Sequence, residues 1–217
     1  MSRTITIPKN NKPFIVNINN REYIYRGGET VEVPDEVAEV IEDALELEPK
    51  PKRYLGKLAL LANGTLTEIT ENDLMGITEI SGYAFYYIKN LRSIEIPLGV
   101  NKIGSYSIAY CSNITHIEIP NSVEVISFRA FSGCNNLTTV IFADNSKLVA
   151  VDEHAFTDCT SLTKVVLKAK KPPSIQANTF SNVPTTCVFE VPAESVEAYK
   201  STANWSAFAN QIVAIKE

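Results

Sequence analysis

The chain has 217 residues, of which 45% are hydrophobic and 21% charged, and its formal net charge is −5 with a sequence pI near 5.2. This length holds one or two domains with a sizeable core, and the composition is that of an ordinary globular protein. The acidic balance argues against nucleic acid, whose binding needs a basic stripe. Because no run approaches the roughly 18 apolar residues of a membrane span, membrane insertion is not expected either.

Residues 1–47 are predicted to form a small α+β domain. A short β-meander is expected over residues 3–33, with a tight turn at Asn19–Asn20. A helix is expected to follow from Pro34, because apolar residues recur with the period of one buried helical stripe: Val37, Val40, Ile41, Ala44 and Leu45. The acidic face opposite that stripe is either a solvated face or a docking surface for a basic partner.

A linker and a cap are expected next. Residues 48–53, Glu-Pro-Lys-Pro-Lys-Arg, have the prolines and charges of a linker between domains. Residues 54–76 are predicted to cap the structure that follows, with strands over 58–61 and 66–69 joined at Asn63–Gly64 as a hairpin.

The rest of the chain is organised by an internal repeat. Leu91-Arg-Ser-Ile-Glu-Ile-Pro97 returns as Ile114-Thr-His-Ile-Glu-Ile-Pro120, a spacing of 114 − 91 = 23 residues. Related segments begin at Leu137 and Leu162, and in each the apolar residues fall at offsets 0, 3 and 5. This pattern is typical of leucine-rich repeats, in which each unit contributes one short strand and the units stack into a solenoid.

Other positions of the unit repeat as well, and they predict columns of like side chains along the core. Four columns are expected: Ile80, Ile103, Ile126, Val151 and Ile175; Ala84, Ser107, Ala130, Ala155 and Thr179; Phe85, Ile108, Phe131, Phe156 and Phe180; and Ile88, Cys111, Cys134, Cys159 and Val183. Adjacent members should lie about 4.7–4.9 Å apart, the distance between neighbouring strands.

These phrases resemble the BspA-like (Treponema-type) leucine-rich repeats, over about residues 77–217. The resemblance rests on Ile117-Glu-Ile-Pro-Asn-Ser-Val-Glu-Val-Ile126, on Ala130-Phe-Ser-Gly-Cys-Asn-Asn-Leu137 and on a tail with Trp205 that looks like the family's C-terminal cap. It implies a mainly β fold with short helices and turns: about five units of 23–25 residues over 77–192, a C-terminal cap over 193–217, and a habit of binding without a reaction. Residues 1–47 weakly resemble leader modules of bacteriophage virion proteins, which implies attachment to a larger assembly or oligomerisation.

Three of the four cysteines, Cys111, Cys134 and Cys159, share one repeat position. Equivalent side chains in stacked units point in parallel, whereas a disulfide needs a specific mutual geometry. A ladder of buried thiols is therefore predicted. The alternative, a metal site, lacks paired C-x-x-C spacing and nearby histidines, and no cofactor is expected. Cys187 falls outside the column and has no assigned role.

Side chains between the inward positions should form an exposed sheet surface. The candidate ligand-binding residues are Ser93, His116, Thr139 and Lys164 in one column, and Glu95, Glu118, Ile141 and Val166 in the other. The second column grades from acidic to apolar, which suits recognition of a protein or glycan. Tyr83, Phe85, Tyr86, Tyr87, Tyr106 and Tyr110 could also stack on sugars, although Phe85 is a core position and some of the tyrosines are expected to be edge packing.

No catalytic constellation is apparent. His116, Glu95 and Glu118 share the exposed surface, and two carboxylates one strand apart have nearly the separation of a retaining glycosidase pair. An open sheet, however, cannot raise one carboxyl pKa by burial. The sequence therefore predicts a non-catalytic binding module, displayed on a bacteriophage particle or, alternatively, acting as a cell-surface or secreted bacterial adhesin; a glycosidase is a distant third. The first residues lack the apolar core of a signal peptide, so synthesis in a cytoplasm is expected.

Overall fold

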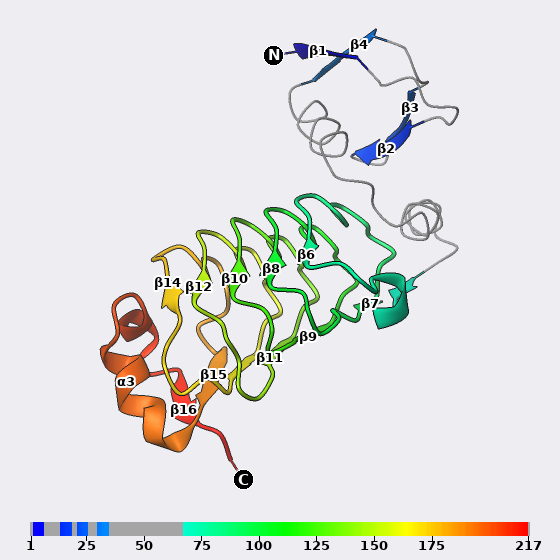
Figure 1. The fold of residues 1–217 in the computed structure, drawn as a ribbon. Coiled ribbons are helices and arrows are strands. Elements are labelled where there is room, and N and C mark those ends of the chain that lie inside the picture. The colour runs from blue at the N-terminus through cyan, green and yellow to red at the C-terminus, as the bar shows by residue number, and fades with distance from the viewer. Residues whose placement is uncertain (1, 7–13, 19–20, 26–29, 35–66, 217) are drawn as a thin grey trace.

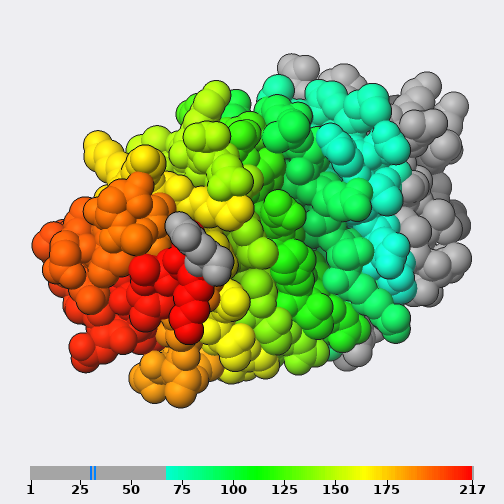
Figure 2. Space-filling view, turned by 90° about the horizontal axis from the view of Figure 1, so that it is seen from below, coloured from blue at the N-terminus to red at the C-terminus, as the bar shows by residue number. Residues whose placement is uncertain are grey.

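A computed structural model of the chain describes residues 2–6, 14–18, 21–25, 30–34 and 67–216 (Figure 1). The helix expected from Pro34, the linker at 48–53 and the strand expected at 58–61 lie outside the described residues. From residue 67 onward the chain is a solenoid of stacked coils, which confirms the fold class predicted from the repeat. In the space-filling view, successive coils follow one another across the surface in sequence order, from cyan through green and yellow to orange (Figure 2).

The described strands near the N-terminus pair as two nested antiparallel ribbons. Strand β1 (Ser2–Thr6) pairs with β4 (Thr30–Pro34), and β2 (Phe14–Ile18) pairs with β3 (Arg21–Tyr25). The predicted meander, in which each strand pairs with the next, is therefore wrong for β1 with β2 and for β3 with β4, and among these strands only β2 and β3 pair as neighbours in sequence. The connection from β1 to β2 is too long to force a hairpin, so β1 is free to pair with β4 instead.

The described part of the solenoid has two five-stranded parallel sheets and, at its N-terminal end, a two-stranded one (Figure 1). The first contains two-residue strands in the order β6 (Glu79–Ile80), β8 (Lys102–Ile103), β10 (Val125–Ile126), β12 (Ala150–Val151) and β14 (Ser174–Ile175). The second contains longer strands in the order β9 (His116–Ile119), β11 (Thr139–Phe142), β13 (Lys164–Leu167), β15 (Val188–Val191) and β16 (Ile212–Ala214). Each of the four coils from β8 to β15 contributes one strand to each five-stranded sheet, and equivalent residues are direct partners, such as Val140 with Ile117 and Val165.

The repeat begins before the segment predicted to start it. Strand β5 (Glu68–Ile69) pairs in parallel with β7 (Ser93–Ile94), and the amide of Arg92 donates to the Thr67 carbonyl (2.7 Å). Ile69 is buried at the same repeat position as Ile94. A 3₁₀ helix, η1 (Glu71–Asp73), follows and is closed by a capping box between Thr70 and Asp73. The segment expected to be a cap therefore already carries a rung of the solenoid.

The predicted core columns are confirmed except at the two ends of the cysteine column, where Ile88 and Val183 are only partly buried. The Ile/Val column from Ile80 to Ile175 and the leucine-type positions from Leu91 to Leu162 are all buried. In the aromatic column the ring centroids of Phe131 and Phe156 lie 5.1 Å apart with an interplanar angle of 2°, and those of Phe156 and Phe180 lie 5.3 Å apart at 6°. The strand spacing thus brings equivalent rings into stacking distance.

A third side of each coil is a turn that runs through the left-handed region of backbone space. Positive φ values recur three and seven residues after the buried Ile/Val: at Tyr83 and Tyr87, at Tyr106 and Tyr110, at Arg129 and Gly133, and at His154 and Asp158. Alternate amides of the turn donate to the next coil, as Tyr83 does to the Ser105 carbonyl (3.0 Å). Inter-coil hydrogen bonds therefore hold non-glycine residues in a conformation they rarely adopt.

The C-terminal cap covers the open end with side chains that satisfy backbone carbonyls. Helix α3 (Val196–Ser201) follows the 3₁₀ helix η2 (Ala193–Ser195), and η3 (Trp205–Phe208) precedes β16. Trp205 Nε1 donates to the Pro173 carbonyl (2.8 Å), and Tyr199 Oη donates to that of Ala169 (2.9 Å). Both rings are fully buried, as expected for a cap.

Candidate functional site

The residues predicted to bind a ligand lie on the outward side of the second sheet and of the adjoining β5–β7 pair, and we call this surface the sheet face. It comprises two columns that also extend beyond the predicted residues: Glu68, Ser93, His116, Thr139, Lys164 and Val188; and Glu95, Glu118, Ile141, Val166, Glu190 and Val213. Strand pairing brings Thr139 beside His116 and Lys164, and Ile141 beside Glu118 and Val166. Strand β9 alternates exposed and buried residues, so His116 and Glu118 point away from the core.

Val166 departs from the expectation of an exposed residue. It occupies the outward register, yet it is 8% exposed. Ile141 and Glu190 are its partners on the two neighbouring strands. Beside it, Lys164 Nζ and Glu190 Oε1 form an ion pair at 3.6 Å. The face therefore does not grade steadily from acidic to apolar, because an acidic residue returns after Val166.

The acidic end of the sheet face is partly fixed by the backbone. Glu95 Oε2 accepts a hydrogen bond from the Glu71 amide (3.0 Å), which ties β7 to η1. Glu68 and Glu118 are exposed on either side of this rung. Near the sheet, a shallow open depression is lined by Arg92, Asn113, Thr115 and Asn136, none of which is a predicted site residue. The carboxylates of Glu68, Glu95 and Glu118 themselves are exposed and lie outside this depression.

A second surface gathers aromatic side chains on the turns of the first three coils. We call it the aromatic face; it comprises Tyr83, Tyr86, Tyr87, Tyr106, Tyr110 and Phe128, all partly exposed. Tyr83 and Tyr106 are stacked, with ring centroids 5.0 Å apart and an interplanar angle of 7°. Tyr86 packs edge-on against Tyr110 (5.6 Å), and Phe128 packs edge-on against Tyr106 (5.5 Å). The tyrosines singled out from the sequence thus form one cluster rather than isolated edge contacts.

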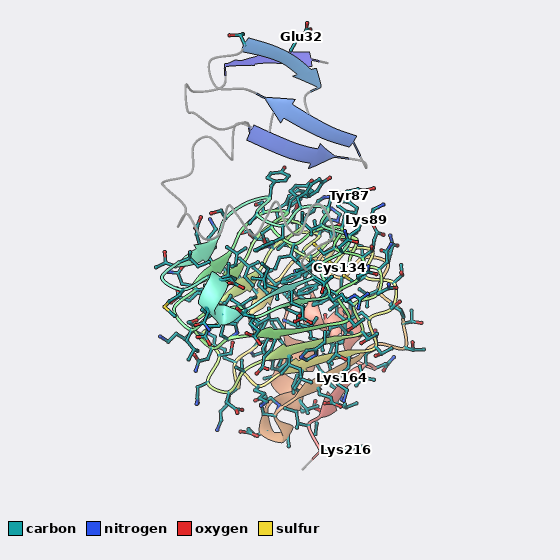
Figure 3. The ribbon with its side chains drawn as sticks, turned by 90° about the vertical axis from the view of Figure 1, so that its right-hand side faces the viewer. Glu32, Tyr87, Lys89, Cys134, Lys164 and Lys216 are labelled. Carbon is teal, nitrogen blue, oxygen red and sulfur yellow. The ribbon has the colours of Figure 1, made fainter. Side chains whose placement is uncertain are left out.

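Two cations of this face were not anticipated from the sequence. Lys89 Nζ lies 4.6 Å from the centre of the Tyr87 ring. The Arg129 guanidinium carbon lies 5.4 Å from the Phe128 ring centre and 6.0 Å from that of Tyr106. The repeat register could have placed Arg129 on this face from the sequence, because Arg129 takes the turn position that Tyr83 and Tyr106 occupy in preceding coils. Figure 3 places Tyr87 and Lys89 at one side of the solenoid and Lys164 of the sheet face at the other.

The cysteines form the predicted ladder of buried, free thiols. Each of the three repeat cysteines donates to a carbonyl of the preceding coil, as Cys134 Sγ does to Ile108 (3.2 Å). Burial raises the pKa of Cys134 to about 12, and it raises the pKa values of Cys111 and Cys159 well above the ordinary value. Among the described residues no group of three or more His, Cys, Asp or Glu side chains is placed to hold a metal ion.

Cys187, unassigned from the sequence, occupies the leucine position of the last rung. Its amide donates to the carbonyl three residues earlier (2.9 Å), as the amides of Leu137 and Leu162 do. Cys187 follows Leu162 by 187 − 162 = 25 residues. Phe189 pairs with Val165 in the sheet, but it comes two positions after Cys187, whereas Val165 comes three positions after Leu162. This shift of one residue hides the equivalence in the sequence.

The parallel coils, the buried leucine-type positions and the capped end define a leucine-rich-repeat solenoid. Residues 60–210 match the model of the BspA type leucine rich repeat region, in six copies. The chain therefore belongs to the BspA-type leucine-rich-repeat family. The matched region begins before residue 77, in agreement with the rung at β5. Repeats of this class generally present extended surfaces for binding.

Several solved structures are similar to this chain. The pneumococcal vaccine antigen PcpA is 24% identical, over 70% of this chain and 42% of that chain, with a TM-score of 0.48. A leucine rich cell surface protein from Faecalibacterium prausnitzii A2-165 is 17% identical, over 67% and 55% of the two chains, with a TM-score of 0.32. A leucine-rich repeat protein from Bacteroides ovatus ATCC 8483 is 20% identical, over 70% and 55%, with a TM-score of 0.29. This chain spans about half the length of these three, and no curated protein matches it.

Proposed function

We propose that this chain is a non-catalytic recognition module that binds a protein partner through the sheet face. The observation that carries the proposal is the rigid presentation of the two outward columns. Strands β9, β11, β13 and β15 are joined in register, so side chains such as His116, Thr139 and Lys164 are held at the strand spacing of about 4.8 Å. A surface ordered before binding loses little conformational entropy when a partner docks.

The charge distribution selects the kind of partner. Glu68, Glu95 and Glu118 are exposed on consecutive rungs at the N-terminal end of the sheet face. At the other end, Lys164 is already paired with Glu190. A protein that presents a basic patch therefore complements the first three rungs, and opposite charges chiefly raise the rate of association and select among partners.

The test compares charge reversals on two sides of the same coil. We expect Glu118→Lys to weaken capture of the partner at least tenfold, measured by enrichment on the immobilised full chain followed by mass spectrometry. Glu124→Lys is the matched control, because Glu124 is also exposed but lies outside β9. Glu95 is left intact since its carboxylate also accepts the Glu71 amide. A partner that is lost with Glu124→Lys and retained with Glu118→Lys would contradict the proposal.

We further propose that residues 1–47 attach the chain to a larger assembly. The antiparallel pairs β1–β4 and β2–β3 are compatible with a small separate unit. Cleavage within residues 48–53 should leave residues 54–217 folded and able to bind the partner, while 1–47 keeps any oligomerisation. If partner binding follows the fragment 1–47 instead, the solenoid is a spacer.

We propose two candidates for the larger assembly. One is a bacteriophage particle and the other is a bacterial surface, where the chain would act as an adhesin. The similarities described above are to bacterial proteins and do not bear on a bacteriophage particle. Immunodetection of the chain in purified particles and in cell-surface fractions of the producing cells distinguishes the two: each predicts enrichment in one fraction and its absence from the other.

A further inference from the structure

We infer that the aromatic face is a second binding site, distinct from the sheet face, and that its ligand is an oligosaccharide carrying carboxylates. The inference does not depend on the proposed role of the sheet face. It rests on two observations: a continuous cluster of partly exposed rings, and two cations held on those rings.

The rings offer flat apolar surfaces with polar tips. Tyr87 and Tyr110 lie on adjacent coils with ring centroids 6.2 Å apart and an interplanar angle of 56°, and Phe128 continues the cluster onto the third coil. A pyranose ring has an apolar face of C–H groups and an edge of hydroxyls, so it matches a tyrosine that presents its ring and its hydroxyl together. The row crosses three coils, which suits an extended chain of sugars rather than one small molecule.

The backbone holds these side chains in place. Tyr87 and Tyr110 have φ values of 61° and 59°, and their amides donate to the carbonyls of Ala109 and Ser132 in the next coil (2.8 Å each). The Tyr110 ring also lies directly over Gly133, where an added Cβ would be 2.5 Å from the ring. The platform is therefore preorganised, which reduces the entropy lost on binding.

The cations give the site its charge selectivity. Among the described residues neither Lys89 nor Arg129 forms an ion pair, whereas Lys164, Lys168 and Lys170 do, with the partners Glu190, Asp144 and Glu194. Arg129 Nε is buried and has no hydrogen-bond partner. Two cations on aromatic rings in a chain of net charge −5 point to an anionic ligand. The carboxylates of uronic acids supply that charge beside the sugar faces that stack on the rings.

Acidic residues on the turn of the next coil limit how far the ligand-binding site extends along the solenoid. One coil beyond Phe128 and Arg129 the equivalent positions are Glu153 and His154, and Asp158 follows. His154 is engaged with Thr157 and Asn178 at 3.0 Å each. Because Glu153 and Asp158 would repel a carboxylate, the ligand is expected to cover the first three coils and to stop there.

The experiment titrates the full chain with a hyaluronan octasaccharide and an oligogalacturonate, with neutral chitohexaose as the reference, by isothermal calorimetry or protein-observed NMR. We expect at least one acidic probe to bind at least tenfold more tightly than chitohexaose, with an affinity that falls as salt is raised. Lys89→Gln, an exposed change that leaves the rings in place, should remove the preference for the acidic probe. Tyr87→Ala combined with Tyr110→Ala should reduce binding of that probe at least tenfold.

The controls separate this site from the sheet face and from a loss of folding. Glu118→Lys should leave oligosaccharide affinity unchanged, and circular dichroism should show that the tyrosine variants keep the wild-type spectrum. The inference is overturned if neither acidic probe binds, if Lys89→Gln leaves the preference intact, or if the tyrosine changes alter the oligomeric state without changing oligosaccharide binding. The last outcome would make the aromatic face a contact between proteins.

Discussion

The solenoid carries two ladders of aromatic rings, one inside and one on the turns. Inside, Phe131, Phe156 and Phe180 are buried and nearly parallel, with interplanar angles of 2° and 6°. On the turns, one pair of tyrosines is stacked, but most neighbouring rings meet edge-on or tilted, as Tyr86 and Tyr110 do at 84°. The coil spacing stacks rings at equivalent positions in both ladders, as for Tyr83 and Tyr106 at 7°, whereas rings at unlike positions meet edge-on, as Tyr86 and Tyr110 do on the turns and Phe180 and Phe189 do inside at 75°.

The comparison also separates stability from recognition. The inner ladder fills a column in which every coil needs a large apolar side chain. The outer ladder changes its chemistry from coil to coil, with Tyr83, Tyr106, Arg129 and His154 at one turn position. Packing against neighbouring side chains constrains a residue in the core, whereas a surface residue can vary and contact a ligand. Substitutions in the two ladders should therefore differ in kind as well as in size.

The largest effect is expected on the rate at which a thiol reagent labels the buried cysteines. Under native conditions all four cysteines should react with iodoacetamide at least a thousandfold more slowly than a model thiol, because labelling must await opening of the core and the raised pKa values disfavour the thiolate. Mass spectrometry of labelled peptides measures the rates. At pH 9 Cys134 should still react far more slowly than the model thiol, because its pKa of about 12 lies above this pH and its thiol stays protonated while the model thiol is largely ionised. Rapid labelling of Cys134 would contradict the buried ladder.

The inner ring ladder comes next. Phe156→Ala removes a ring stacked on both sides, and we expect it to lower the free energy of unfolding by about 3–5 kcal/mol. Phe156→Leu keeps most of the volume and should cost less than about 1.5 kcal/mol. Urea denaturation followed by circular dichroism gives both values. Equal, small changes for the two variants would mean that the ring at this position is not needed for packing.

The turn beneath the Tyr110 ring predicts an intermediate effect. Gly133 has a φ of +71°, and a Cβ added there would lie 2.5 Å from the Tyr110 ring. Gly133→Ala should therefore lower the unfolding free energy by about 1–3 kcal/mol, through strain and overlap. Gly99→Ala is the matched control, because its φ is +109° but nothing lies within 4 Å of the added atom.

A double substitution isolates the overlap. With Tyr110→Ala in place, Gly133→Ala should cost only what backbone strain costs, so the two changes should not be additive. Additive costs would show that the Tyr110 ring does not press on this turn.

The smallest effect is expected on the outer ladder. Tyr87→Ala removes a partly exposed ring and its contact with Lys89, and should change the unfolding free energy by about 1 kcal/mol or less. Thermal unfolding by differential scanning calorimetry measures it. A loss as large as that of Phe156→Ala would place Tyr87 in the core and remove the distinction between the ladders.

The sequence by itself determined which residues occupy equivalent places in successive coils. The offsets of Leu91, Ile94 and Ile96, and the recurrence of Phe and Cys, predicted the buried columns, because every coil must bury the same edge against its neighbours. The alternation along β9 likewise predicted that His116 and Glu118 face outward.

Tertiary structure decided how different positions of the coil meet. The repeat period does not predict three features of the structure. These are the burial of Val166 between neighbouring strands, the shift that puts Cys187 in a leucine position, and the pairing of β1 with β4. The gathering of Lys89, Phe128 and Arg129 beside the tyrosines is of the same kind. A repeat specifies contacts between like positions, one strand spacing apart. Contacts between unlike positions depend on the left-handed turns and on the packing of individual side chains, and these form only when the coils are stacked.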